Sequence, residues 1–290
     1  MKPAKFEYHA PDSVPEALAL LGELRGQDAK VLAGGQSLMP LLNMRLARPS
    51  HVVDINGLRD LDYITPTADG GLAVGTLTRQ RALERSPEVA SRVPLLAEAI
   101  PLVGDRQVRT RGTLGGSLAH ADPAAELATV AVALDAELLL TSPTQSRTVR
   151  ATEFFVTVLT TLLEEDELLR EVRFPPPHPG AGHAFLELTR QRGAYAIVSA
   201  AAVLALEDNR IVDARLVLGG VGPTPIDSEN AREALIGHEP SDGLFSAAAR
   251  LAAEDSDPDA DVHGTVAYRK EMAQVYAKRA FKIAVSRATA

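Results

Sequence analysis

The sequence predicts an α+β protein with more than one domain, and three observations support this. Near the N-terminus a strand, a glycine loop, a helix and a second strand follow closely, as in a small βαβ unit. In the last third, three strand-like runs precede three helical segments, which is typical of α+β domains. Between these regions lies a run of three prolines at 175–177. We therefore expect domains at 1–177 and 178–290, with the first divided near residue 57.

The N-terminal unit begins with a helix. Ser13 is the predicted N-cap, Glu16 occupies the third helical position of a capping box, and the helix is expected to end near Gly26. Leucines with helical spacing line one of its faces. The rest of the unit is expected as a strand at 30–33, a helix at 38–46 and a strand at 51–55.

The middle of the chain alternates strands and helices. Asp122 is predicted as the N-cap of a helix that starts with Pro123 and ends near residue 134. Arg106, Arg109 and Arg111 are most simply the solvated face of a strand, although basic side chains here would also suit a diphosphate. The other expected elements are strands at 72–75, 137–141 and 168–174 and a helical stretch from 78 to about 100.

The C-terminal part is predicted as an antiparallel meander followed by helices. Its strand-like runs are spaced for tight connections. The strands are expected at 184–189, 198–206 and 211–218, and the helices at 228–236, 244–253 and 265–288.

Two short glycine loops, at 33–37 and 113–117, carry the strongest functional signal. Paired glycines remove the Cβ atoms that would keep an anion from the backbone, and they adopt positive φ without penalty. Main-chain N–H groups can then turn toward a phosphate. Two such loops predict a diphosphate held from both sides, as in a dinucleotide.

Polar residues after the second loop are candidate ligand contacts. Glu126 is expected to accept hydrogen bonds from ribityl or ribose hydroxyls. For Asp122, a structural role as a helix cap and a functional role are equally expected. His120 is more simply a loop histidine bonded to the backbone than a proton-transfer group.

Composition excludes several other classes. A net charge of −8 without a long basic stretch argues against nucleic acid, and the absence of Cys excludes disulfides and iron–sulfur ligation by this chain. The seven His residues are scattered, so no metal site is expected, and no catalytic nucleophile motif is found. The acidic stretch 255–261 is interpreted as a solvated loop. Without a signal peptide or an apolar run of about 18 residues, we expect a cytoplasmic protein with no membrane span.

Several sequence motifs make the chain resemble a known family, the FAD-binding medium subunit of molybdenum hydroxylases. This family includes carbon monoxide and xanthine dehydrogenases. The matching segments are FEYHAP at 6–11, LAGGQSL at 32–38, NMRLARP at 43–49, VDIN at 53–56 and TLGGSLAHADPAAE at 113–126. The resemblance implies a two-subdomain FAD domain of the vanillyl-alcohol-oxidase type. A C-terminal domain with a three-stranded antiparallel sheet and helices would follow it.

The resemblance also implies where FAD binds. Both glycine loops would hold its diphosphate, Glu126 would contact the ribityl side, and Tyr195 would lie near the isoalloxazine ring. Relatives often carry a basic residue around Glu187 and an acidic one at Ala194, so this chain's flavin environment differs. The full predicted set is Leu32, Ala33, Gly34, Gly35, Gln36, Ser37, Leu38, Thr113, Leu114, Gly115, Gly116, Ser117, His120, Asp122, Glu126 and Tyr195.

The implied function is electron transfer inside a hetero-oligomeric hydroxylase. A large subunit would carry the molybdenum cofactor, a small subunit the [2Fe–2S] clusters, and this chain FAD, with no catalytic residue of its own. Two alternatives remain open: a stand-alone flavin oxidase or reductase of the same fold, and a flavin-binding assembly protein. The substrate and the electron acceptor are not determined by the sequence.

Overall fold

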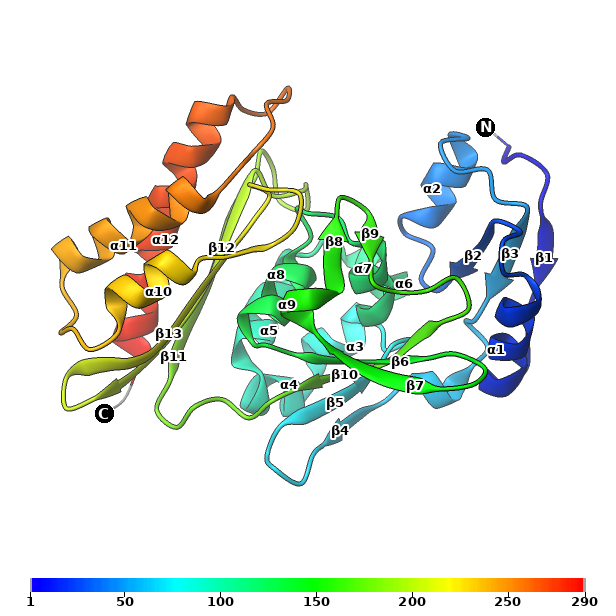
Figure 1. Ribbon diagram of the computed structural model, residues 1–290, viewed down its shortest axis with the longest axis horizontal. Coiled ribbons are helices and arrows are strands. Elements are labelled where there is room, and N and C mark those ends of the chain that lie inside the picture. The colour runs from blue at the N-terminus through cyan, green and yellow to red at the C-terminus, as the bar shows by residue number, and fades with distance from the viewer. Residues whose placement is uncertain (1, 289–290) are drawn as a thin grey trace.

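The computed structural model describes residues 2–288. Figure 1 shows three parts side by side along the long axis: a small N-terminal unit, a central part and a C-terminal part with long helices. The proposed boundary at residue 177 lies between β10, which ends at Phe174, and β11, which begins at Gly182. The boundaries themselves stay a prediction.

The N-terminal unit contains the predicted strand–loop–helix–strand order. Its sheet has the order β1–β3–β2 with parallel pairing throughout, so the βαβ prediction is confirmed. The Ser13 hydroxyl accepts a hydrogen bond from the Glu16 N–H at 3.3 Å, as a capping box requires, while the Glu16 carboxylate accepts from Asp12. The short strand β1 was not predicted. The elements are β1 (Glu7–His9), α1 (Val14–Glu23), β2 (Ala29–Leu32), α2 (Leu38–Asn43) and β3 (His51–Asp54).

The central part is built on an antiparallel sheet of order β4–β5–β10–β6–β7 covered by short helices. The helical stretch predicted from 78 to 100 is interrupted, because Pro87 and Pro94 each begin a new helix. The strands are β4 (Ile64–Pro66), β5 (Leu72–Gly75), β6 (Glu137–Thr141), β7 (Ser146–Arg150), β8 (Phe155–Thr157), β9 (Thr160–Thr161) and β10 (Leu168–Phe174). The helices are η1 (Arg59–Leu61), α3 (Gln80–Arg85), α4 (Pro87–Arg92), α5 (Pro94–Ala99), η2 (Ile100–Leu102), α6 (Arg106–Arg111), α7 (Leu114–His120), α8 (Glu126–Ala133) and α9 (Ala151–Phe154).

The predicted strand before the second glycine loop is wrong. Arg106 to Arg111 form helix α6, and Arg109 is only 6% exposed. Its guanidinium pairs with Glu84 at 3.0 Å and donates to the Val103 and Gly104 carbonyls. Asp105 caps the helix by accepting from the Val108 N–H, a local signal that the alternation of arginines obscured. Arg109 is therefore a buried structural cation.

The predicted start of helix α8 is also wrong. The helix begins at Glu126, and Asp122 lies before it in a turn, where its carboxylate accepts from the Ala124 N–H at 2.9 Å. An aspartate before proline favours such a turn as strongly as it favours a helix cap. Asp122 and Glu126 therefore do not share a first helical turn.

The C-terminal part consists of an antiparallel sheet of order β11–β12–β13–β14 and three helices. The three predicted strands and three predicted helices are present, and the two-residue strand β14 is an addition too short to predict. Ser228, Ser241 and Thr265 cap the helices through their hydroxyls. The elements are β11 (Gly182–Leu188), β12 (Val198–Glu207), β13 (Arg210–Gly219), β14 (Ile226–Asp227), α10 (Glu229–Leu235), α11 (Asp242–Asp255) and α12 (Val266–Arg287).

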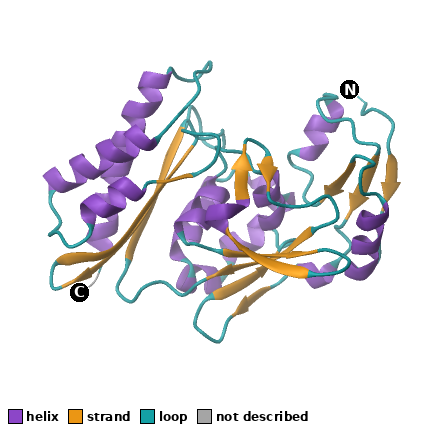
Figure 2. Cartoon of the chain, in the orientation of Figure 1, coloured by secondary structure: helices purple, strands orange, loops and turns teal. Residues whose placement is uncertain are grey.

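This sheet is covered on both faces. Helices α10 to α12 pack on one face, while Phe185, Ala201 and Val217 on the other join the core of the central part. Figure 2 shows the sheet between the two groups of helices. Because side chains alternate along a strand, Glu187 lies on the same face of β11 as Phe185 and points toward the central part.

Candidate functional site

The two glycine loops meet in the structure, although they lie far apart in the chain. A Cβ atom on Gly34 would lie 2.5 Å from the carbonyl oxygen of Arg111 and 2.8 Å from the Cα of Gly112. A Cβ atom on Gly116 would lie 3.4 Å from the Cβ of Ala33. The loops therefore pack backbone against backbone, and Gly34 permits this approach because it has no side chain.

Two residues without a predicted role hold the loops together. The Asn56 side-chain amide donates to the Ala33 carbonyl at 2.5 Å. The Arg79 guanidinium donates to the Asn56 side-chain oxygen at 2.7 Å and to the Arg111 carbonyl at 2.6 Å. This Asn56–Arg79 latch joins strand β3 to both loops. Asn56 stands in one of the motifs quoted above, but nothing in the sequence singles out Arg79.

The first loop presents free hydrogen-bond donors. The backbone N–H groups of Gly34, Gly35, Gln36 and Ser37 donate no hydrogen bond within residues 2–288. Gly35 has a φ of +72°, the left-handed conformation that turns the chain here. A row of free amides at the carboxyl end of a parallel strand is a suitable environment for an anion.

The second loop is different, because its amides are already used. Leu114 and Gly115 donate to the Thr78 and Thr76 carbonyls, and Gly116 donates to the Thr113 hydroxyl at 3.0 Å. Ser117 donates to the Thr113 carbonyl as α7 begins. The N–H groups of residues 114 to 117 are thus not available to an anion, unlike those of the first loop. The second loop supports the first and offers the Ser117 hydroxyl.

A buried and a half-buried carboxyl group, those of Glu126 and Glu187, influence each other near the loops. Glu126, at the start of α8, is 5% exposed, and burial, aided by the negative charges of Glu187 and Asp122, raises its pKa to about 7. Burial likewise raises the pKa of Glu187 to about 7. One oxygen of Glu187 is buried and has no hydrogen-bond partner within residues 2–288. An unpaired buried carboxyl oxygen is costly and indicates a missing ligand or a bound proton.

Tyr195 completes the arrangement from the loop between β11 and β12. The residue is 63% exposed, yet its hydroxyl end lies near the Ser37 hydroxyl and the carboxyl groups of Asp122 and Glu126. Partial burial raises the pKa of the phenol, and the two carboxylates raise it further. The structure thus brings together residues from all three parts of the chain. His120 is the last residue of α7 and not a loop residue, and its ring makes no hydrogen bond within residues 2–288, so the expected bond to the backbone is not found.

The joint between the C-terminal sheet and the Asp122 turn is fixed by hydrogen bonds. The Gly220 N–H donates to the Pro123 carbonyl at 2.9 Å. Arg269 is buried and donates to the Ile197 and Gly220 carbonyls, and its guanidinium pairs with Asp261 at 2.7 Å. Asp261 is exposed, as expected of the acidic loop, and its pair with Arg269 also ties that loop to this joint.

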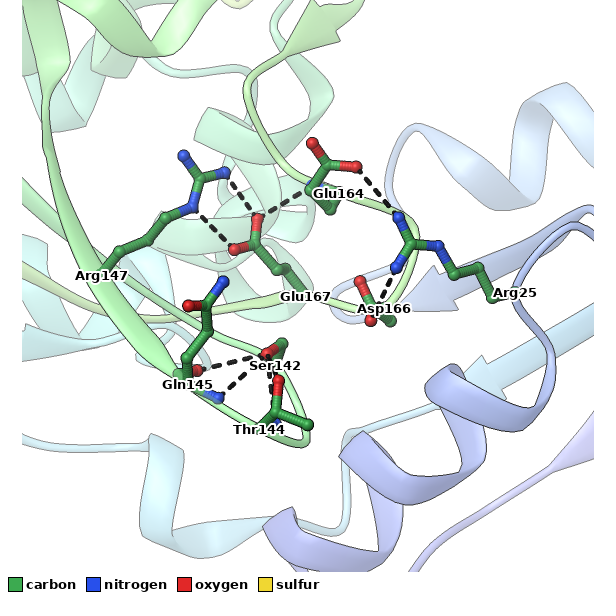
Figure 3. A pocket seen from close by; sticks show the side chains of 8 residues that line it. All are labelled: Arg25, Ser142, Thr144, Gln145, Arg147, Glu164, Asp166 and Glu167. Atoms are coloured by element: carbon green, nitrogen blue, oxygen red, sulfur yellow. Dashed lines mark hydrogen bonds and ion pairs between the residues drawn. The ribbon is translucent and has the colours of Figure 1, made fainter.

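A polar hollow of about 410 Å³ lies elsewhere, and Figure 3 shows its lining side chains. Its charges are paired: Arg147 binds Glu167 at 2.7 Å, and Arg25 lies 3.3 Å from Asp166. Arg25 follows α1, so its pair with Asp166 connects the N-terminal unit with the central part. With its charges satisfied internally, this hollow is a joint between subdomains rather than a ligand site.

Comparison with known proteins agrees with this geometry. Residues 4–177 match the family described as the FAD binding domain in molybdopterin dehydrogenase, and residues 183–284 match the CO dehydrogenase flavoprotein C-terminal domain. The chain belongs to the FAD-binding medium subunits of the molybdenum hydroxylases. The cofactor of this flavoprotein subunit is FAD, and it is an oxidoreductase subunit, as the resemblance predicted.

The relatives of the flavoprotein subunit cover its whole length. It is 40% identical to the carbon monoxide dehydrogenase medium chain of Hydrogenophaga pseudoflava, over 99% of both chains. It is 41% identical to the 6-hydroxypseudooxynicotine dehydrogenase complex subunit alpha of Paenarthrobacter nicotinovorans, over 99% of this chain and 97% of that one.

Solved structures agree. Carbon monoxide dehydrogenase from H. pseudoflava superposes with a TM-score of 0.97 at 40% identity, covering 100% of both chains. Quinoline 2-oxidoreductase from Pseudomonas putida 86 gives 0.93 at 37% identity, covering 99% of both chains. These matches confirm the predicted fold of an FAD domain followed by a C-terminal domain. Among residues 2–288, none of the helices combines the length and apolar character needed to span a bilayer.

Proposed function

We propose that this subunit holds FAD across its three parts and passes electrons from [2Fe–2S] clusters on a partner subunit to an external acceptor. A large subunit with a molybdenum cofactor would oxidise the substrate. The names of these relatives, medium chain and complex subunit, support an assembly of this kind. The solved H. pseudoflava enzyme is described as lacking the Mo-pyranopterin moiety of its molybdenum cofactor. Because this chain has no Cys, the clusters must be bound by another chain.

The row of free amides in the first loop carries the proposal for the binding site. N–H groups of residues 34 to 37 would bind the diphosphate, backed by the second loop and the Asn56–Arg79 latch. The proposed contacts are the residues named from the sequence, at 32–38 and 113–117 together with His120, Asp122, Glu126 and Tyr195.

The Glu126 and Glu187 carboxyls suit the polyol chain between the diphosphate and the ring. A ribityl hydroxyl could donate to Glu126 on α8, and the unpaired buried oxygen of Glu187 on β11 is a second acceptor. FAD supplies the one- and two-electron chemistry when bound. The residues of this chain bind it, orient it, exclude water and hold a proton at the Glu126–Glu187 pair near neutral pH.

A titration with FAD and FMN tests the binding mode. The apoprotein is expected to bind FAD at least tenfold more tightly than FMN, because FMN offers only one phosphate to the amides of the first loop. Flavin fluorescence quenching gives both affinities, and equal values would overturn the diphosphate assignment. Electron transfer is tested separately by mixing the FAD-loaded subunit anaerobically with a reduced [2Fe–2S] partner and following flavin absorbance. A flavin that stays oxidised would favour an assembly protein.

One observation favours the alternative of a stand-alone flavin oxidase. Carboxyl groups with pKa values of about 7 are suited to general acid–base work. If the purified, FAD-loaded chain oxidised a small alcohol without partners, this alternative would replace the electron-transfer proposal.

A further inference from the structure

A cluster of metal-ligand side chains lies on the sheet of the N-terminal unit. Strands β1 and β3 are parallel neighbours, with Glu7 opposite His51 and His9 two residues further along β1. Residues i and i+2 of a strand share a face, so all three side chains project to the same side of the sheet. Composition alone predicted no metal site, because His9 and His51 are 42 residues apart in the chain.

The distances in this cluster are close to those of a coordination sphere. The Nε2 atom of His9 lies 3.1 Å from the Nδ1 atom of His51, and that Nδ1 lies 3.6 Å from a carboxylate oxygen of Glu7. The three ligand atoms all lie within 4.8 Å of one another. Zinc–nitrogen bonds of about 2.0–2.1 Å at tetrahedral angles place two imidazole nitrogens about 3.3 Å apart. Small rotations of the side chains would therefore create the site.

We propose that Glu7, His9 and His51 bind one divalent transition metal ion, with Zn²⁺ as the reference ion. Two imidazoles and one carboxylate suit zinc, copper or nickel and not calcium or magnesium, which prefer oxygen ligands. The His51 side chain is 14% exposed and that of Glu7 is 71% exposed, so the site is buried on its His51 side and open to solvent on its Glu7 side. A water molecule would take the fourth position.

The proposed ion would fasten the edge strand β1 to β3. His51 pairs with Ala29 at the start of β2, whereas the first glycine loop follows Leu32 at the other end of that strand. Metal binding and FAD binding are therefore expected to be separable. Without metal, the two imidazoles are linked by a hydrogen bond, as the 3.1 Å distance shows.

Calorimetry with ZnCl₂ on the chelator-treated full chain tests the site. We expect one Zn²⁺ per chain, with affinity reduced at least a hundredfold in His9→Ala and in His51→Ala. Glu7→Gln should reduce zinc affinity by a smaller factor, because the two imidazoles remain. His178→Ala is the matched control, since this exposed histidine lies far along the chain and should leave zinc affinity unchanged. FAD affinity measured on each variant checks that it is folded.

Zinc should also raise the melting temperature of the wild-type chain and not that of His9→Gln, which keeps a polar side chain on β1. X-ray absorption should report nitrogen and oxygen ligands at about 2.0–2.1 Å. Zinc binding of equal strength in the wild type, His9→Ala and His51→Ala would overturn the proposal. So would the absence of stoichiometric binding, which would leave the histidine pair as a hydrogen bond only.

Discussion

Replacing Glu126 with Gln should change the stability of the apoprotein in a pH-dependent way. The carboxyl has a pKa of about 7 in the folded protein, against an ordinary value of 4.5, because it is buried. A group whose pKa is raised on folding stabilises the folded state below its ordinary value, and that contribution is lost as the pH rises through about 7. The difference between the two pKa values corresponds to a loss of at most about 3 kcal/mol in the free energy of unfolding above pH 7.

Glutamine has nearly the same shape and carries no charge at any pH. The Glu126→Gln apoprotein should therefore exceed the wild type by no more than about 1 kcal/mol at pH 5 and by up to about 3 kcal/mol at pH 8. Urea unfolding at the two pH values measures this. Glu84→Gln is a control of opposite sign, because Arg81 and Arg109 hold the pKa of Glu84 below its usual value. Loss of the Glu84 negative charge should destabilise the apoprotein at pH 8.

FAD affinity provides the functional half of the same experiment. If the Glu126 carboxylate accepts ribityl hydroxyls, its replacement removes charge-assisted bonds worth ~1.5–3 kcal/mol, roughly ten- to hundredfold in affinity at pH 8. The loss should shrink at pH 6, where the wild-type group is largely protonated. An unchanged affinity at pH 8 would make Glu126 purely structural. If Glu126→Gln instead destabilised the apoprotein at both pH values, burial would not be what penalises the Glu126 charge.

Three further variants test the surrounding structure. Gly116→Ala would place a Cβ atom 2.7 Å from the capping hydroxyl of Thr113, so FAD affinity should fall at least tenfold, with a cap loss of about 1 kcal/mol in urea unfolding. Unchanged affinity would separate the second loop from the ligand. Asn56→Ala should lower the free energy of unfolding by about 1–2 kcal/mol and weaken FAD binding, because it removes the Asn56–Arg79 latch between the loops. Full FAD affinity in a destabilised variant would contradict this. Asp261→Asn should destabilise the protein at pH 7, since Arg269 lowers the pKa of this carboxyl to about 2. That difference from the wild type should vanish as the pH falls through about 2, and a difference independent of pH would point to packing instead.

Much of the architecture follows from local patterns in the sequence. Ser13 and Thr265 cap helices because their hydroxyls bind nearby N–H groups, and this interaction needs no distant partner. The strand-like runs that form β10 to β13 and the strand–loop–helix–strand order are local in the same sense. Errors arose where two local structures compete, as at Asp122, where a turn replaces the predicted helix cap.

The sequence by itself determined the cofactor class and named candidate residues for its site. Only the tertiary structure decided which of them meet. The burial of Arg109 depends on Glu84, and the pairing of His9 with His51 depends on strand register. The raised pKa of Glu126 depends first on its burial by the folded chain and only secondarily on the charge of Glu187. The physical reason is that burial and charge are properties of surroundings assembled from distant segments. Backbone preference and hydrogen-bond capacity belong to each residue and can be predicted from the sequence.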